Sequence, residues 1–126
     1  MEDNNFILIS SQQMQERFTA ILLSAGFTNE RASQCAAIFT ANSVDGIYTH
    51  GVNRFPRFIQ YVKDGYVLPN ETPVLKNKFS GIEQWDGNLG PGTLNAQHAT
   101  SRAINLAQQH GIGCVALANT NHWMRG

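Results

Sequence analysis

The sequence has little charge and no excess of either sign. Only 14% of the 126 residues are charged, with nine basic and nine acidic side chains, against about 25% in typical soluble domains. Without a basic field, the chain lacks the attraction with which proteins hold nucleic-acid phosphates, so no nucleic-acid partner is expected. Polarity comes instead from 12 Asn and 9 Gln. An amide-rich surface suits a chain partly covered by other protein, although compositional drift explains it equally well.

Long apolar runs and paired cysteines are also missing. No run approaches the roughly 18 to 20 apolar residues that span a bilayer, and the start, MEDNNFILIS, lacks the basic stretch of a secretory signal. No membrane partner is therefore expected. Cys35 and Cys114 are 79 positions apart in apolar stretches and form neither a disulfide framework nor a C-x-x-C motif. These features predict a reduced, cytoplasmic compartment.

Several catalytic signatures are absent. No pair of His, Cys, Asp or Glu has the spacing of a zinc site, and no G-x-S-x-G elbow occurs, so the sequence predicts neither a metal site nor a serine hydrolase. The segment 87–93 lies where phosphate loops are found, but Asn95 stands where a third glycine of G-x-G-x-x-G belongs. A tight turn before a helix is the simpler interpretation. His98 and His110 are interpreted as structural.

Apolar residues at helical spacing predict three helices in the first 70 residues. Ser10 and Gln13 match a capping box, Thr28 is a second N-cap, and Pro56 suits a first helical turn. The predicted helices begin near Ser10, Thr28 and Pro56 and end at Gly26, Gly46 and Gly65.

The second half predicts a sheet interrupted by one long helix. Short strands are expected at 74–79 and 82–86, joined by a turn at Ser80 and Gly81. Thr93 is expected to cap a helix that runs to about His110. The apolar run 112–118 is then expected to be a strand buried on both faces. The fold class is therefore α/β (α+β), with N-terminal helices leading into the first strands of a mixed sheet.

Two polar loops carry candidate chemistry. His50 lies between two predicted helices, and its imidazole suits proton transfer near neutral pH, while Arg54 offers a planar fork that matches a carboxylate. His122 follows the last predicted strand, where α/β sheets commonly bind ligands. Alternatively, His50 is an ordinary surface histidine, Arg54 caps a carbonyl, and residues 119–123 form a polar turn.

Three sequence blocks carry a resemblance to a known family. They are the segments 48–58, 82–86 and 110–126, which include a [Ser/Thr]-His-Gly-x-x-Arg block at 49–54 and an Asn-x-Asn-His block at 119–122. From about Ser11 onward the chain resembles the malate/L-lactate dehydrogenase-like oxidoreductases, which depend on NAD(P)H and lack the usual Rossmann fingerprint. Thr49 stands where many members have Ser, which keeps a hydroxyl.

The resemblance implies an oxidoreductase that transfers a hydride between a nicotinamide cofactor and a 2-keto or 2-hydroxy sugar acid. The expected cofactor is NAD as NADH, with NADP as the alternative. Residues 1–70 are expected to form a helical region, and residues 71–126 the truncated start of an α/β nucleotide-binding domain with a non-Rossmann fold. Family members form dimers or larger assemblies, so a homo-oligomer is expected at full length. A catalytically inert fragment and a helical interaction module remain the alternative functions.

The resemblance also implies residue roles. His50 and His122 are the expected catalytic acid/base residues, with His50 as the proton donor to the substrate carbonyl. Arg54 is expected to hold the substrate carboxylate, with Thr49 and Asn121 as further substrate contacts. Asn119 and His122 are expected to border the cofactor.

Overall fold

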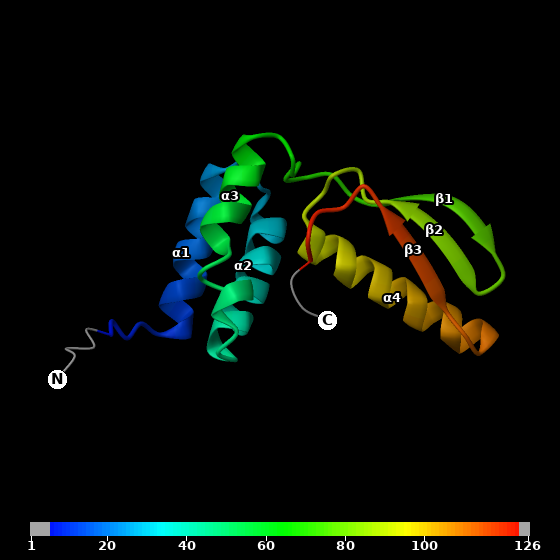
Figure 1. The fold of residues 1–126 in the computed structure, drawn as a ribbon, viewed down its shortest axis with the longest axis horizontal. Helices are drawn as coiled ribbons and strands as arrows, with labels where there is room; N and C mark the ends of the chain where they lie inside the picture. The colour runs from blue at the N-terminus through cyan, green and yellow to red at the C-terminus, as the bar shows by residue number, and fades with distance from the viewer. Residues whose placement is uncertain (1–5, 124–126) are drawn as a thin grey trace.

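The chain folds as a group of three helices followed by a small sheet with a fourth helix against it (Figure 1). The computed structural model describes residues 6–123, so the acidic start of the chain and the last three residues of the family-like block lie outside it. The elements are α1 (Ser11–Ser24), α2 (Asn29–Val44), the 3-10 turn η1 (Tyr48–His50), α3 (Phe55–Lys63), β1 (Val74–Phe79), β2 (Ile82–Asp86), α4 (Gly92–His110) and β3 (Cys114–Ala118).

The ends of the first helices follow the predicted capping signals. Ser10 and Gln13 form the reciprocal capping box at the start of α1, and the side chain of Thr28 accepts from the Arg31 N–H at the start of α2. Pro56 lies in the first turn of α3, where its missing N–H leaves no helical hydrogen bond unmade. The predicted fold class and helix starts are thus confirmed, and each of the three helices ends two residues before the predicted glycine, at Ser24, Val44 and Lys63.

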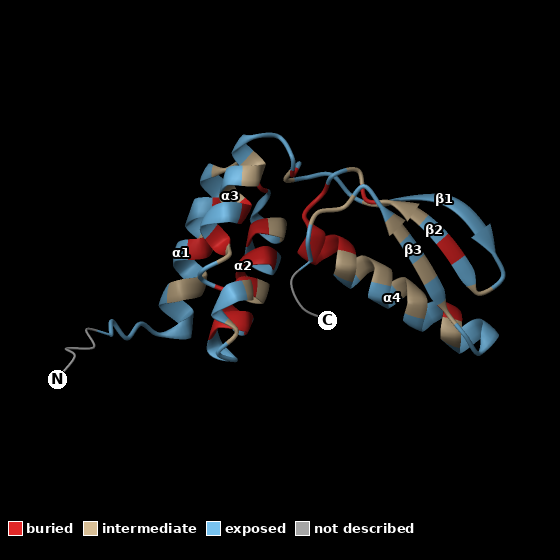
Figure 2. Cartoon of the chain, in the orientation of Figure 1, coloured by how far each residue is buried: buried red, intermediate tan, exposed pale blue. Residues whose placement is uncertain are grey.

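Aromatic rings from all three helices form the core of the helical part. Figure 2 shows buried segments on each of these helices. The rings of Phe18 and Phe55 stack with centroids 4.0 Å apart, and Phe39 meets Phe55 edge-on at 5.1 Å. Phe39 is completely buried, and Phe58 packs on it at 5.2 Å. Burying rings of this size is the main stabilising contribution here, because each removes a large apolar area from water.

The three strands form a mixed sheet in the order β1-β2-β3. β1 and β2 form an antiparallel hairpin in which Phe79 pairs with Ile82 and the turn residue Ser80 takes a positive φ of 49°. β2 and β3 run parallel, with Asp86 opposite Ala118, so α4 serves as the crossover that a parallel pair requires. The carboxyl ends of β2 and β3 therefore lie at the same edge of the sheet.

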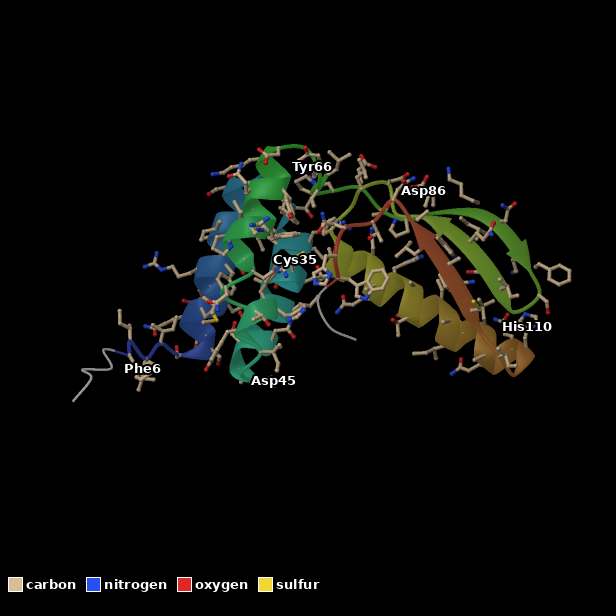
Figure 3. All side chains as sticks on the ribbon, in the orientation of Figure 1. Phe6, Cys35, Asp45, Tyr66, Asp86 and His110 are labelled. Atoms are coloured by element: carbon tan, nitrogen blue, oxygen red, sulfur yellow. The ribbon has the colours of Figure 1, made fainter. Side chains whose placement is uncertain are left out.

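The start of α4 joins the two parts of the molecule. Leu94 belongs to the same buried cluster as the helical aromatics, and Thr93 Oγ1 lies 3.7 Å from the Sγ of Cys35 on α2. Burial raises the pKa of the Cys35 thiol to about 11, so this cysteine stays protonated and acts as a packing group. Figure 3 places Cys35 on the side of the helical part that faces α4.

Two expectations about the second half are wrong. Thr93 does not cap α4, which begins at Gly92 after Pro91, because its hydroxyl faces Cys35 instead. The last strand spans Cys114–Ala118 rather than 112–118, and it is not buried on both faces. Cys114, Ala116 and Ala118 are exposed, and Val115 and Leu117 are half-buried, because α4 covers only one face of the sheet.

A buried ion pair ties α4 to the middle strand. The Glu83 side chain is fully buried and accepts two hydrogen bonds from Arg102, at 2.6 Å and 3.0 Å, and a third from the indole N–H of Trp85 at 2.8 Å. These bonds, chiefly those from Arg102, lower the pKa of Glu83 to about 2. Because three donors meet one buried carboxylate, the register of α4 on the sheet depends on Glu83.

We expect Glu83→Gln to lower the free energy of unfolding by about 2 kcal/mol at pH 7, since it replaces charged hydrogen bonds by neutral ones. The native pKa of Glu83 is depressed, so its contribution is complete above the unfolded value near 4.5 and is lost as pH falls toward about 2. Urea unfolding at pH 7 and pH 3 measures the free energy of unfolding of both chains. The difference in this free energy between Glu83→Gln and the native chain should be smaller at pH 3 than at pH 7.

The control is Lys76→Gln, which removes the surface ion pair of Lys76 with Asp86, with N and O 3.7 Å apart. This change should alter stability by less than about 1 kcal/mol. Equal effects of the two variants would contradict a special role for the buried pair.

Candidate active site at the meeting of two loops

The end of α2 fixes the short turn that carries His50. The buried Asn42 donates from its side-chain amide to the carbonyl oxygen of His50 at 3.0 Å. The buried Ser43 hydroxyl accepts from the Val52 N–H at 2.9 Å and donates to a carbonyl of its own helix. Gly51 lies so close to α2 that a Cβ there would overlap the Ser43 side chain and backbone. His50 is thus placed by three contacts of the turn with one helix end.

The side chains of the turn then orient one another. Thr49 Oγ1 lies 3.0 Å from Nδ1 of His50, which leaves Nε2 as the ring nitrogen that faces away from the turn. Arg54, at the N-terminal end of α3, donates from Nε to the Thr49 carbonyl at 3.4 Å. The carbonyl-capping interpretation of Arg54 thus describes one of its contacts, and its terminal nitrogens have no hydrogen bond among the contacts of the described residues.

The second loop follows β3 and is held by the loop that follows β2. Gly87 N–H donates to the Ala118 carbonyl and Leu89 N–H to the Asn119 carbonyl, both at 2.8 Å. Asn119 adopts a positive φ of 48°, which turns the chain away from the strand direction. Its side chain donates to Asp86 at 3.2 Å. This turn sends residues 120–123 back toward the helical part.

The two loops meet at the imidazoles of His50 and His122. Their ring centroids are 5.5 Å apart, with the rings tilted by 44°. Beside them is a small cavity of about 10 Å³, lined by Arg54, Phe58, Tyr61, Asn121 and His122. That volume holds about one water molecule. Residues about 70 positions apart in the sequence therefore share one site.

The site is cationic on one side and aromatic on the other. Partial burial lowers the pKa of His122, and the nearby charge of Arg54 and the ring of His50 lower it further. The residues that line the cavity include no Asp or Glu. An anion that approaches Arg54 would meet unbalanced positive charge, and it would favour the protonated form of His122.

The structure brings together most of the predicted site residues. Thr49, His50, Arg54, Asn121 and His122 surround the cavity or contact residues that do, whereas the side chain of Asn119 turns to Asp86 on the far side of the loop. His98 packs against Trp85 with ring centroids 4.4 Å apart, and His110 lies at the distant end of α4 (Figure 3), so neither residue joins this site.

Sequence reasoning missed the residues that support the site. Asn42 and Ser43 lie within the second predicted helix, and nothing in their spacing indicates that they bind the turn eight or nine residues later. Gly51 was the available signal, since a glycine beside a candidate histidine allows close backbone approach. In the sequence, Asn95 stands out only as a departure from a glycine motif.

Other ligand chemistries find no support among residues 6–123. No cluster of three or more His, Cys, Asp or Glu is placed to hold a metal ion. Within the same range, no helix combines the length and the hydropathy needed to cross a bilayer. The first turn of α4 does not offer a free phosphate cradle, because a Cβ at Gly92 would overlap the backbone oxygens of Asn121 and His122. The loop before α4 is a turn, as the simpler interpretation had it.

Comparison with known proteins identifies the family. The family model for malate/L-lactate dehydrogenase matches residues 9–126, and the chain therefore belongs to this family. It is 46% identical over 118 residues to the 2,3-diketo-L-gulonate reductase of Escherichia coli O1:K1 and 45% identical to that of Haemophilus influenzae. Each match covers 94% of this chain and 36% of the relative, so the chain spans about a third of the length of these curated relatives.

Solved structures agree on the fold. Malate dehydrogenase from Pyrococcus horikoshii superposes with a TM-score of 0.90 at 24% identity, over 97% of this chain and 35% of that one. Sulfolactate dehydrogenase from Methanocaldococcus jannaschii gives 0.88 at 27% identity, over 94% and 34%. The three helices, the small mixed sheet and the crossover helix are thus a recurring unit of larger dehydrogenases.

We expect Gly51→Ala to destabilise the chain by about 1–3 kcal/mol, because the new methyl group must push the turn away from Ser43. Urea unfolding measures the loss, and the His50 NMR signal should shift as the turn moves. Val52→Ala, one position along on the partly exposed face, is the control and should cost about 0.5 kcal/mol or less. An unchanged stability of Gly51→Ala would contradict the described approach of turn and helix.

We expect Arg54→Gln to raise the pKa of His122, because removing a neighbouring positive charge stabilises the imidazolium. Titration of the imidazole proton signals by NMR measures the shift, which should be larger at low salt. Arg57→Gln is the matched control, since the exposed Arg57 guanidinium contacts the Tyr61 hydroxyl and does not contribute to lowering the His122 pKa. A His122 pKa that is the same in both variants would mean that Arg54 does not face this ring.

Proposed function

We propose that the chain supplies the proton-donating and carboxylate-binding part of a nicotinamide-dependent reductase for 2-keto acids, in the longer enzyme of which its relatives are examples. One observation carries this proposal: His50 and His122, from two distant loops, lie 5.5 Å apart beside Arg54 in a site whose lining includes no carboxylate. Membership of the malate/L-lactate dehydrogenase family supports the reaction class. The relatives named 2,3-diketo-L-gulonate reductase support a sugar acid as the substrate.

Each residue then has a distinct task. Arg54 holds the substrate carboxylate with its planar fork, which fixes where the adjacent keto group points. His50 gives a proton to the carbonyl oxygen as negative charge develops on it, and Thr49 holds the ring through Nδ1 so that Nε2 faces the substrate. Asn121 adds an amide contact to the substrate. His122 is the second acid/base group, and binding of an anion raises its pKa toward the working range.

The residues present fit only the reacting end of the cofactor. The imidazole and amides that follow β3 would border the nicotinamide, with His122 and Asn119 as the proposed contacts. The cofactor, when bound, supplies a hydride to the keto carbon. The loop after β3 covers the start of α4, so this helix offers no free N-terminus to the pyrophosphate. We infer that phosphate-binding groups come from other parts of the full enzyme.

Further expectations from the sequence belong to the same proposal. We infer a division into a helical region, residues 1–70, and the start of a nucleotide-binding domain, residues 71–126. The choice of NADH over NADPH, assembly as a homo-oligomer and a cytoplasmic location stay predictions. The exposed edge and open face of β3 support the view that further strands and a partner complete this sheet.

The decisive test is kinetic. This chain, joined to the remaining two thirds of the 46%-identical Escherichia coli reductase, gives a full-length enzyme in which loss of NADH absorbance reports reduction of 2,3-diketo-L-gulonate. We expect His50→Ala to reduce kcat by about 10²- to 10⁴-fold with little change in KM, since it removes the proton donor. Near-normal turnover of this variant would contradict the role of His50.

Arg54→Ala in the same enzyme should raise KM by about tenfold to a hundredfold, because the carboxylate loses its charged hydrogen bonds. Arg17→Ala, which removes an exposed guanidinium from α1 outside the cavity lining, is the control and should leave both constants unchanged. Equal effects of the two arginine variants would count against a carboxylate contact at Arg54.

A further inference from the structure

Asn95 is a fully buried amide in the first turns of α4 that the proposed chemistry does not use. Its Nδ2 lies 3.1 Å from the Gly87 carbonyl oxygen, 3.3 Å from the Gly90 carbonyl oxygen and 3.0 Å from Thr120 Oγ1. The first two acceptors belong to the loop after β2, and the third to the loop after β3. One side chain therefore binds both of the loops that meet at the carboxyl edge of the sheet.

The orientation of this amide is fixed by its surroundings. Two carbonyl oxygens face Nδ2, and a flipped amide would place Oδ1 against both of them. Oδ1 has no hydrogen-bond partner among the described residues. A buried acceptor without a partner is unfavourable. Asn95 therefore stabilises the structure only through the hydrogen bonds that its Nδ2 donates to the two loops.

Thr120 connects the Asn95 side chain to the loop that carries His122. Its hydroxyl oxygen accepts from Asn95 and donates weakly to the Asn121 carbonyl at 3.5 Å, one residue before His122. Gly92, three residues before Asn95 on the same helix face, lies directly under the Asn121 and His122 backbone. The loop that carries His122 thus rests on α4 and is bound to it by the Asn95 side chain.

We propose that Asn95 is a positioning residue that holds His122 against His50 and Arg54 through its hydrogen bond to Thr120. The consequence for catalysis rests on the proposed function, whereas the effect on the position of His122 does not. An imidazole released from this contact would move away from Arg54 and His50, which both lower its pKa, and into water.

The test is made on the 126-residue chain by NMR and needs no enzyme activity. Two readouts are the pKa of His122 and the through-space contact between the His50 and His122 rings. Thr120→Val keeps the shape of the side chain but removes the acceptor oxygen, and Thr120→Ser keeps that oxygen. We expect Thr120→Val to raise the His122 pKa toward the ordinary value near 6.5 and to weaken the ring contact, and Thr120→Ser to leave both unchanged.

Asn95→Ala should produce the same two changes as Thr120→Val. If Asn95→Ala does not fold, the comparison of Thr120→Val with Thr120→Ser still tests the proposal, because these two substitutions change only a half-buried side chain between α4 and the loop after β3. Unchanged pKa and ring contact in Thr120→Val would overturn the proposal, as would equal shifts in the Val and Ser variants. Because no substrate or cofactor is added, these outcomes stand whether or not the full-length enzyme reduces a 2-keto acid.

Discussion

The parallel pairing of β2 with β3 is the constraint on which the site depends. A parallel pair places the carboxyl ends of both strands at one edge, so the loops that follow Asp86 and Ala118 emerge side by side. Hydrogen bonds between these loops then turn residues 119–123 away from the sheet. The buried pair of Glu83 with Arg102 keeps the crossover helix in register with the middle strand, which sets the place where α4 begins.

The helical part supplies the opposite wall of the site, and there too the end of a helix holds the loop that carries a histidine. The aromatic core holds α2 and α3 against each other, and the 3-10 turn between them is bound to the last turn of α2 by Asn42 and Ser43. Leu94 joins the start of α4 to this core. Since both walls are anchored to one continuous set of buried contacts, the distance between His50 and His122 does not depend on any long flexible segment.

Local structure was readable from the sequence because its signals are local. The capping box at Ser10, the cap at Thr28 and the hairpin turn at Ser80 all depend on residues a few positions away, and each was predicted correctly. The prediction that Thr93 caps α4 was wrong because a contact distant in the sequence decides where its hydroxyl points. A threonine before a helix is a good N-cap in isolation, but its hydroxyl faces Cys35, which lies 58 positions earlier, and no local rule detects such a contact.

In the candidate site, too, the sequence predicted some residues and not others. Residue types and a family resemblance pointed to Thr49, His50, Arg54, Asn121 and His122, but not to the buried amides and hydroxyls that hold them. Apolar periodicity also overestimated the burial of β3, because periodicity reports what a strand can bury and not what is present to cover it. Cys114, Ala116 and Ala118 are exposed because α4 covers only the other face of this strand. The described contacts hold the two imidazoles from different helices, because Asn42 and Ser43 of α2 bind the turn that carries His50 and Asn95 of α4 binds the loop that carries His122.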